Sequence, residues 1–154
     1  MKRFVWRLQR VLDIKIKEEE VKRAELIKVT ERLAATRGEL LMQKRILENI
    51  ISDIAGKKTA ERLREQEFFL KHSKATGERI KKLEKKVREL EAEQRKKIAE
   101  VLKVRQFRKG LERLREEAKR KFIEEEEKLE QKELDEGSTI SFARKMQNIT
   151  AGSR

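Results

Sequence analysis

Few residues in this chain have the types and spacing that chemistry requires. His72 is the only histidine and cysteine is absent, so neither a nucleophile–base pair nor a thiolate metal site is indicated. The consecutive glutamates 124–127 point in different directions on a helix and do not converge on a metal ion. None of the six glycines immediately precedes a Lys-Ser or Lys-Thr pair, as a phosphate-binding loop requires. We therefore predict a protein that is not an enzyme, with no catalytic residue, metal site or cofactor.

An apolar triplet, Phe68-Phe69-Leu70, indicates binding instead. The tip of a two-helix hairpin has little core in which all three side chains can be buried. Met42, Ile46 and Ile50 lie along one flank of the preceding helix and can extend the same surface. Because exposed apolar patches usually mark partner sites, we predict a partner-binding tip made of Phe69, Leu70, Phe68, Met42 and Ile46. The alternative is a small local core that closes the tip.

The apolar triplet and its neighbours must lie on long helices, and the chain has the heptad repeat that is typical of long paired helices. One large aliphatic residue recurs every seven positions from Leu26 to Ile54, and a second series begins at Ile80. A repeat of seven is buried when two helices wind around each other in a left-handed supercoil. Two such series on one chain predict an antiparallel hairpin. The predicted seam consists of Leu26, Leu33, Leu40, Leu47, Ile54, Ile80, Leu83, Val87 and Leu90.

The seam is expected to vary in width and phase along the hairpin. Further apolar residues are expected to broaden the first stripe, namely Ala34, Leu41, Ile50 and Ile51. The second stripe continues at Val101, Val104 and Leu111. Between Leu90 and Val101, Gln94 and Lys97 weaken the apolar pattern, and Ile98 and Leu102 are expected to shift its phase.

Composition agrees with an all-α fold. The chain has 154 residues, of which 46% are charged, and contains no proline. Disorder is compatible with a net charge of +13, but disordered segments have no reason to space their leucines. Glu, Lys, Arg, Leu and Ala are strong helix formers. We predict a long antiparallel two-helix coiled-coil hairpin with a short helical tip segment.

The glycines suggest where the helices end. We expect a hairpin over residues 1–137, with a first arm at 4–54, a tip at 55–77, a second arm at 78–136, and a flexible basic tail at 138–154. The turn is expected either near 55–59, after Gly56, or near 72–77, ending at Gly77. Gly137 is expected to end the second arm. Folding back would place the acidic residues 124–136 beside the basic residues 2–17.

The basic charge leaves an alternative function open. A pI near 10 is typical of proteins that bind nucleic acid or anionic membrane surfaces. The basic residues, however, are spread along both arms rather than gathered before the heptads as in a leucine-zipper DNA reader. No apolar run indicates a secretory signal or a membrane span, so we expect a cytoplasmic protein. Residues 1–17 are expected to be the first turns of the long helix or, alternatively, a basic amphipathic segment at a membrane.

The opening residues, Phe4-Val5-Trp6-Arg7-Leu8-Gln9-Arg10-Val11-Leu12-Asp13, followed by glutamates 18–20, resemble the flagellar export protein family FliJ. The segment 130–136 is similar to that family's closing segment, so the resemblance covers about residues 4–136. It implies a stalk-like antiparallel coiled coil, similar in form to the central stalk of rotary ATP synthases.

This resemblance also implies the partners. They are the hexameric export ATPase, the export-gate platform membrane protein and export chaperones, met at the cytoplasmic face of the inner membrane. The platform contact in this family is an exposed surface near the tip, which Phe69 and Leu70 match best. Flagellar and virulence-type secretion stalks share this build and are not separated by the sequence.

Overall fold

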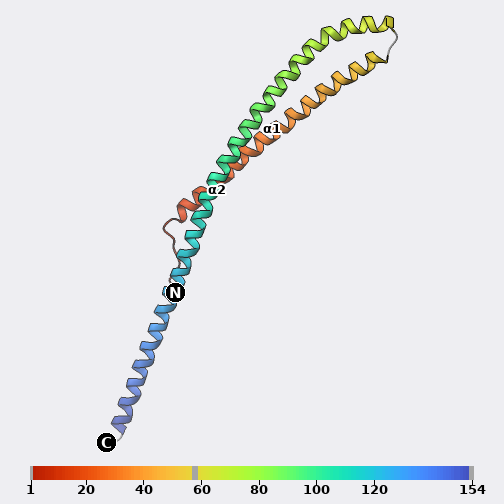
Figure 1. Ribbon diagram of the computed structural model, residues 1–154. Coiled ribbons are helices and arrows are strands. Elements are labelled where there is room, and N and C mark those ends of the chain that lie inside the picture. The colour runs from red at the N-terminus through yellow and green to blue at the C-terminus, as the bar shows by residue number, and fades with distance from the viewer. Residues whose placement is uncertain (1, 57–58, 153–154) are drawn as a thin grey trace. The chain divides into compact units, whose positions relative to one another are not determined.

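The computed structural model describes residues 2–56 and 59–152, which form two long helices (Figure 1). Helix α1 spans Gln9–Ala55 and helix α2 spans Thr59–Gly152. The two helices run antiparallel, and no strand occurs in the described residues. The predicted all-α helical hairpin is confirmed. Lys57 and Lys58 lie outside the described residues.

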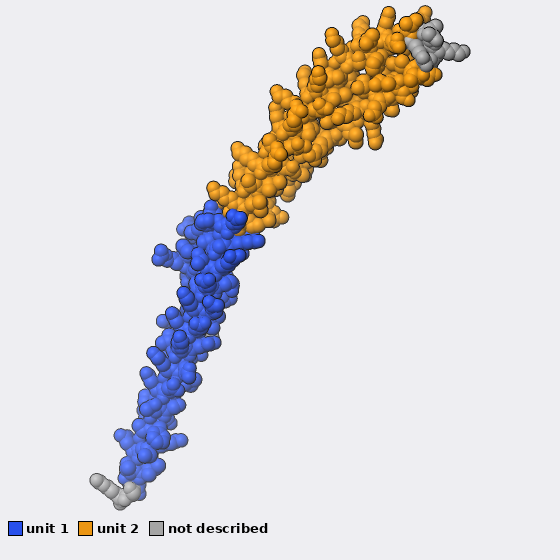
Figure 2. Space-filling model, viewed as in Figure 1, with its two compact units in different colours: residues 1–16, 106–154 blue, residues 17–105 orange. Residues whose placement is uncertain are grey.

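The chain divides into two units (Figure 2). Unit 2 comprises residues 17–105 and contains most of α1 and the first half of α2. Unit 1 comprises residues 1–16 and 106–154. In each unit a segment from the start of the chain packs against a segment of α2.

The seam of unit 2 follows a strict heptad repeat. On α1 the inward positions alternate at spacings of three and four, and include the buried residues Val29, Leu33 and Thr36. Thr36 is satisfied within the helix, because its hydroxyl donates to the carbonyl of Arg32 at 2.8 Å. The stripe is narrower than expected, since the side chains of Ala34, Leu41 and Ile51 are exposed. The second set of inward positions on α1 consists of Val29, Thr36, Gln43 and Ile50. Two of these four residues are polar, which was not predicted.

The expected phase shift in α2 is wrong. Gln94 and Lys97 occupy the inward positions, while Ile98 and Leu102 remain 40% and 47% exposed. Polar residues stay in the seam because the opposite helix supplies partners. The side-chain amide of Gln94 donates to the hydroxyl of Thr30 at 3.2 Å. The heptad repeat therefore continues without interruption to Val101 and Val104, which are buried.

The expected breaks at residues 72–77 and at Gly137 are also wrong, because α2 runs through both. Helix α1 ends at Ala55 and α2 begins at Thr59, so most of the predicted tip segment is the start of α2. A helical glycine is disfavoured by under about 1 kcal/mol relative to alanine, too little to break a helix that contains no proline. The segment predicted to be a flexible tail is helical and exposed over residues 138–152.

Unit 1 begins with a non-helical segment, because α1 starts at Gln9 rather than near Phe4. The amide of Gln9 donates to the carbonyl of Trp6 at 3.2 Å. The Phe4 ring lies 5.5 Å from that of Phe122. This register leaves residues 124–136 beyond the paired region of unit 1, so they do not lie beside residues 2–17 as expected.

Candidate partner-binding surfaces

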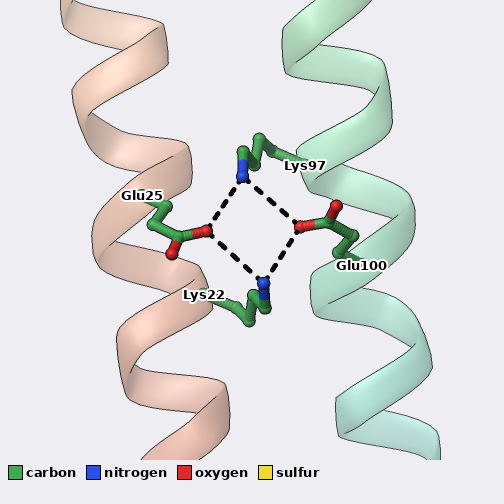
Figure 3. A network of polar contacts seen from close by, with 4 residues as sticks. All are labelled: Lys22, Glu25, Lys97 and Glu100. Carbon is green, nitrogen blue, oxygen red and sulfur yellow. Dashed lines mark hydrogen bonds and ion pairs between the residues drawn. The ribbon is translucent and has the colours of Figure 1, made fainter.

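Four charged residues cross the seam of unit 2 and form a closed quartet (Figure 3). The Lys97 ammonium lies 3.0 Å from Glu25 Oε2 and 3.5 Å from Glu100 Oε2. The Lys22 ammonium lies 3.3 Å from Glu100 Oε2 and 3.6 Å from Glu25 Oε2. Each helix contributes one lysine and one glutamate, so every ion meets two opposite charges. Any other register would separate these partners, and the quartet therefore sets the level of one helix against the other.

The quartet also shifts the pKa values of Glu25, Glu100 and Lys97. The hydrogen bond from Lys97 lowers the pKa of the Glu25 carboxyl, and nearby Lys22 lowers it further. The hydrogen bond from Lys22 likewise lowers the pKa of Glu100. The bond to Glu25 raises the pKa of Lys97. Glu25, Glu100 and Lys97 are consequently held in their charged forms around neutral pH.

Further cross-helix pairs keep the same register on both sides of the quartet. Arg105 Nε donates to Glu19 Oε1 at 3.0 Å, and the Glu19 side chain is buried. Toward the tip, Arg37 pairs with Glu91 at 2.8 Å. These contacts hold the end of α1 and the start of α2 at the same level.

At that end of unit 2, an open groove of about 450 Å³ lies between the two helices. Ile50 and Ile54 of α1 and Phe68 of α2 provide its apolar surface. The Phe68 ring also contacts the His72 ring, with 4.1 Å between centroids. The groove is thus lined by both apolar and charged side chains. Its remaining lining residues are Asp53, Arg64 and Glu65.

The predicted triplet does not form one patch. Phe69 occupies an inward heptad position and is half-buried. Phe68 and Leu70 are 61% and 68% exposed. Because successive helical residues are turned by about 100°, these two side chains lie on opposite sides of Phe69. Only Phe68 lines the groove.

Met42 and Ile46 are exposed but lie away from the triplet. Lys44, between them on α1, pairs with Glu84 of α2 at 3.5 Å. Leu70 precedes Glu84 by 14 residues on α2, which is roughly 20 Å along a helix. The structure therefore does not bring Met42 into a common surface with the tip residues. Ile50, expected on the same flank as Met42 and Ile46, does line the groove. Sequence reasoning missed Ile54 there, because its heptad spacing assigned it to the seam alone.

The predicted seam residues all lie along the helix pair. Leu33 and Leu90 are buried. The other seven are half-buried, as the edges of a two-helix seam remain open to water: Leu26, Leu40, Leu47, Ile54, Ile80, Leu83 and Val87.

A second hollow, of about 350 Å³, lies in unit 1 beside the opening segment. Phe4 and Trp6 line it together with Arg115 of α2. The Arg115 guanidinium stands 6.0 Å from the Phe4 ring centre and donates to Gln9 Oε1 at 2.8 Å. Arg115 thus anchors the opening segment to α2 through Phe4 and Gln9.

In residues 2–56 and 59–152, no three His, Asp or Glu side chains are grouped closely enough to hold a metal ion. Neither helix, over its described length, contains an apolar stretch long enough to cross a membrane.

The comparisons with known proteins agree with the opening motif. The model of the family described as flagellar FliJ protein matches residues 3–147. Comparison with curated proteins finds no match, and neither does comparison with solved structures.

Proposed function

We propose a stalk and adaptor role for this chain, which belongs to the flagellar FliJ protein family and is therefore a protein of the flagellar export apparatus. In this role it couples the hexameric export ATPase to the export-gate platform membrane protein and engages export chaperones. It acts in the cytoplasm, at the cytoplasmic face of the inner membrane, and performs no chemistry of its own.

The groove at the tip of unit 2 supports the gate contact most directly. Ile50, Ile54 and Phe68 form an apolar surface at the end of a helix pair. Exposed apolar surfaces of this kind are typical of partner sites. We assign the gate contact to this groove and to the exposed Leu70, two residues after Phe68 on α2.

The helix pair itself supports the ATPase contact. A pair of helices has a narrow cross-section and long charged faces, so it can stand at the centre of a ring and contact several subunits at once. The quartet of Lys22, Glu25, Lys97 and Glu100 keeps the two helices from sliding. A push or rotation at one place on unit 2 is then transmitted along it.

Replacing Phe68 and Leu70 together by alanine tests the gate contact. Both side chains are more than half exposed, so helicity in far-UV circular dichroism should be unchanged. Affinity for the gate-platform protein should fall at least about tenfold, as expected for interface anchors. ATPase binding, measured in parallel by pull-down, should be retained.

Leu134→Ala is the matched control, because Leu134 is 71% exposed and belongs to unit 1. It should bind the gate platform as the parent chain does. Full gate affinity in the Phe68→Ala/Leu70→Ala variant would remove the tip groove from the mechanism.

One observation favours a second function, binding to nucleic acid or an anionic membrane surface. The side of α2 that faces away from α1 carries a row of exposed basic side chains, and no ion pair of theirs occurs among the described residues. The row consists of Lys81, Lys82, Lys85, Arg88, Arg95, Lys96 and Lys103. This function predicts affinity for duplex DNA or anionic vesicles that falls steeply with salt and does not respond to the tip substitutions.

A further inference from the structure

Helix α1 has a second apolar face, on the side opposite its seam. Val21, Ile27, Leu41 and Met42 are exposed by 57, 54, 54 and 58%. Together with small residues, they recur at the spacings of one helical face. The small residues are Ala24, Ala34, Ala35 and Gly38, all exposed. Large apolar side chains so exposed along about six turns are more than the packing of this hairpin requires.

Charged residues on the same face are also left without partners by the hairpin. Lys28, Glu31, Arg45 and Glu48 are exposed, and none of them pairs with another described residue. By contrast, Arg37 and Lys44, at the edge of the seam, pair across to α2. Ion pairing within the chain therefore does not account for the charges of the outer face.

The pattern is complementary to itself when reversed about Gly38. A second copy of α1, running antiparallel with a two-fold axis at Gly38, places Leu41 against Ala35 and Met42 against Ala34. Large side chains then meet small ones on both halves of the interface. The charges match as well, because Glu31 falls opposite Arg45 and Lys28 falls opposite Glu48. A parallel arrangement in register would set each of these charges against itself.

Gly38 lies at the centre of this face without an internal reason to be glycine. A side-chain carbon built there would meet nothing within 4 Å, and glycine disfavours a helix by up to about 1 kcal/mol relative to alanine. Two helices approach most closely where they cross at small residues. The axis position is therefore the place where a glycine contributes to pairing.

We propose that this outer face of α1 binds the same face of a second copy of the chain, forming an antiparallel dimer centred on Gly38. The interface has two-fold symmetry, so each favourable pair occurs twice. The proposal does not depend on the export role, and it assigns Met42 to self-association rather than to the gate contact.

Charge reversal with rescue tests the proposal. Sedimentation velocity of the full chain, between about 1 and 300 μM, should show a monomer–dimer equilibrium. Glu31→Arg makes both symmetric pairs with Arg45 repulsive and should raise the dimer Kd at least about tenfold; Arg45→Glu should do the same. The double variant Glu31→Arg/Arg45→Glu should restore the parent Kd. All three should keep the parent far-UV circular dichroism, since both side chains are exposed.

Cysteine cross-linking tests the register. The chain has no cysteine, so Glu31→Cys and Arg45→Cys each carry a single thiol. A short bis-maleimide should cross-link a mixture of the two variants, but neither variant alone, because like positions lie about 20 Å apart in the antiparallel pair. Gly110→Cys, at an exposed helical glycine of unit 1, should not cross-link with either.

Three results would overturn the proposal. The first is a monomer throughout the concentration range. That result is also expected if the outer face of α1 binds only an amphipathic helix of another protein. The second is a dimer that the double reversal fails to restore. The third is cross-linking of Glu31→Cys to itself.

Discussion

Leu33→Ala should destabilise the hairpin much more than Leu41→Ala, although both replace a leucine of α1. Leu33 is 1% exposed and Leu41 is 54% exposed. The substitution removes about three carbons, or roughly 2.4 kcal/mol of transfer free energy from a fully buried site. A residual cavity raises the loss at Leu33 toward about 3 kcal/mol. At Leu41 about half of the side chain is already in water, so the loss should be near 1 kcal/mol.

Thermal unfolding followed by far-UV circular dichroism measures the difference. At about 2–4 °C per kcal/mol for a chain of this size, Leu33→Ala should lower Tm by roughly 6–12 °C and Leu41→Ala by about 2–4 °C. Dilute protein should be used, so that self-association through Leu41 does not contribute. Equal losses at the two positions would refute the assignment of the buried face, and with it the seam.

Two further predictions concern the charged residues in the seam of unit 2. Lys97→Met should lower the free energy of unfolding at neutral pH. The lowered pKa values of Glu25 and Glu100 mean that their contribution is present above the ordinary value of 4.5 and is lost as pH falls through the folded values. The raised pKa of Lys97 means that its contribution is present below 10.5 and is lost above it. Urea titrations at several pH values should therefore show the deficit of the variant shrinking at both extremes, and a constant deficit would contradict the reasoning. Arg105→Met should lower the free energy of unfolding by about 1–3 kcal/mol, because it removes a cation from the buried Glu19 carboxylate. Glu19→Gln in the same chain should recover part of that loss; no recovery in urea unfolding would contradict the pairing.

The helices and their antiparallel arrangement could be predicted because their causes are local in sequence. A leucine every seven residues and the absence of proline are visible in a single segment. The continuity of the seam at Gln94 and Lys97 could not be predicted in the same way. It depends on Thr30 and Glu25, whose level opposite α2 is known only once the register is set. The continuity of α2 through Gly77 and Gly137 also could not be predicted. A glycine costs a helix under about 1 kcal/mol relative to alanine, and the sequence does not show whether the surrounding residues offset that cost.

The candidate site shows a similar division. The apolar triplet could be found by its composition, but the sorting of its members depends on the phase of α2. That phase turns Phe69 toward the seam and leaves Phe68 in the groove. Ile50 and Ile54 join Phe68 only because the turn follows Gly56. Met42 was grouped with the tip by apparent proximity, and the Lys44–Glu84 pair shows the distance.

The end of α2 has a consequence for how the molecule unfolds. Residues 127–152 are helical and exposed along their whole length, so no other described element packs against them. Most helical stability in proteins comes from such packing. Amide exchange should consequently be fastest at the last turns and slow progressively toward Phe122, where the Phe4 ring packs. This part of the chain frays by degrees, whereas the seam melts as one cooperative block.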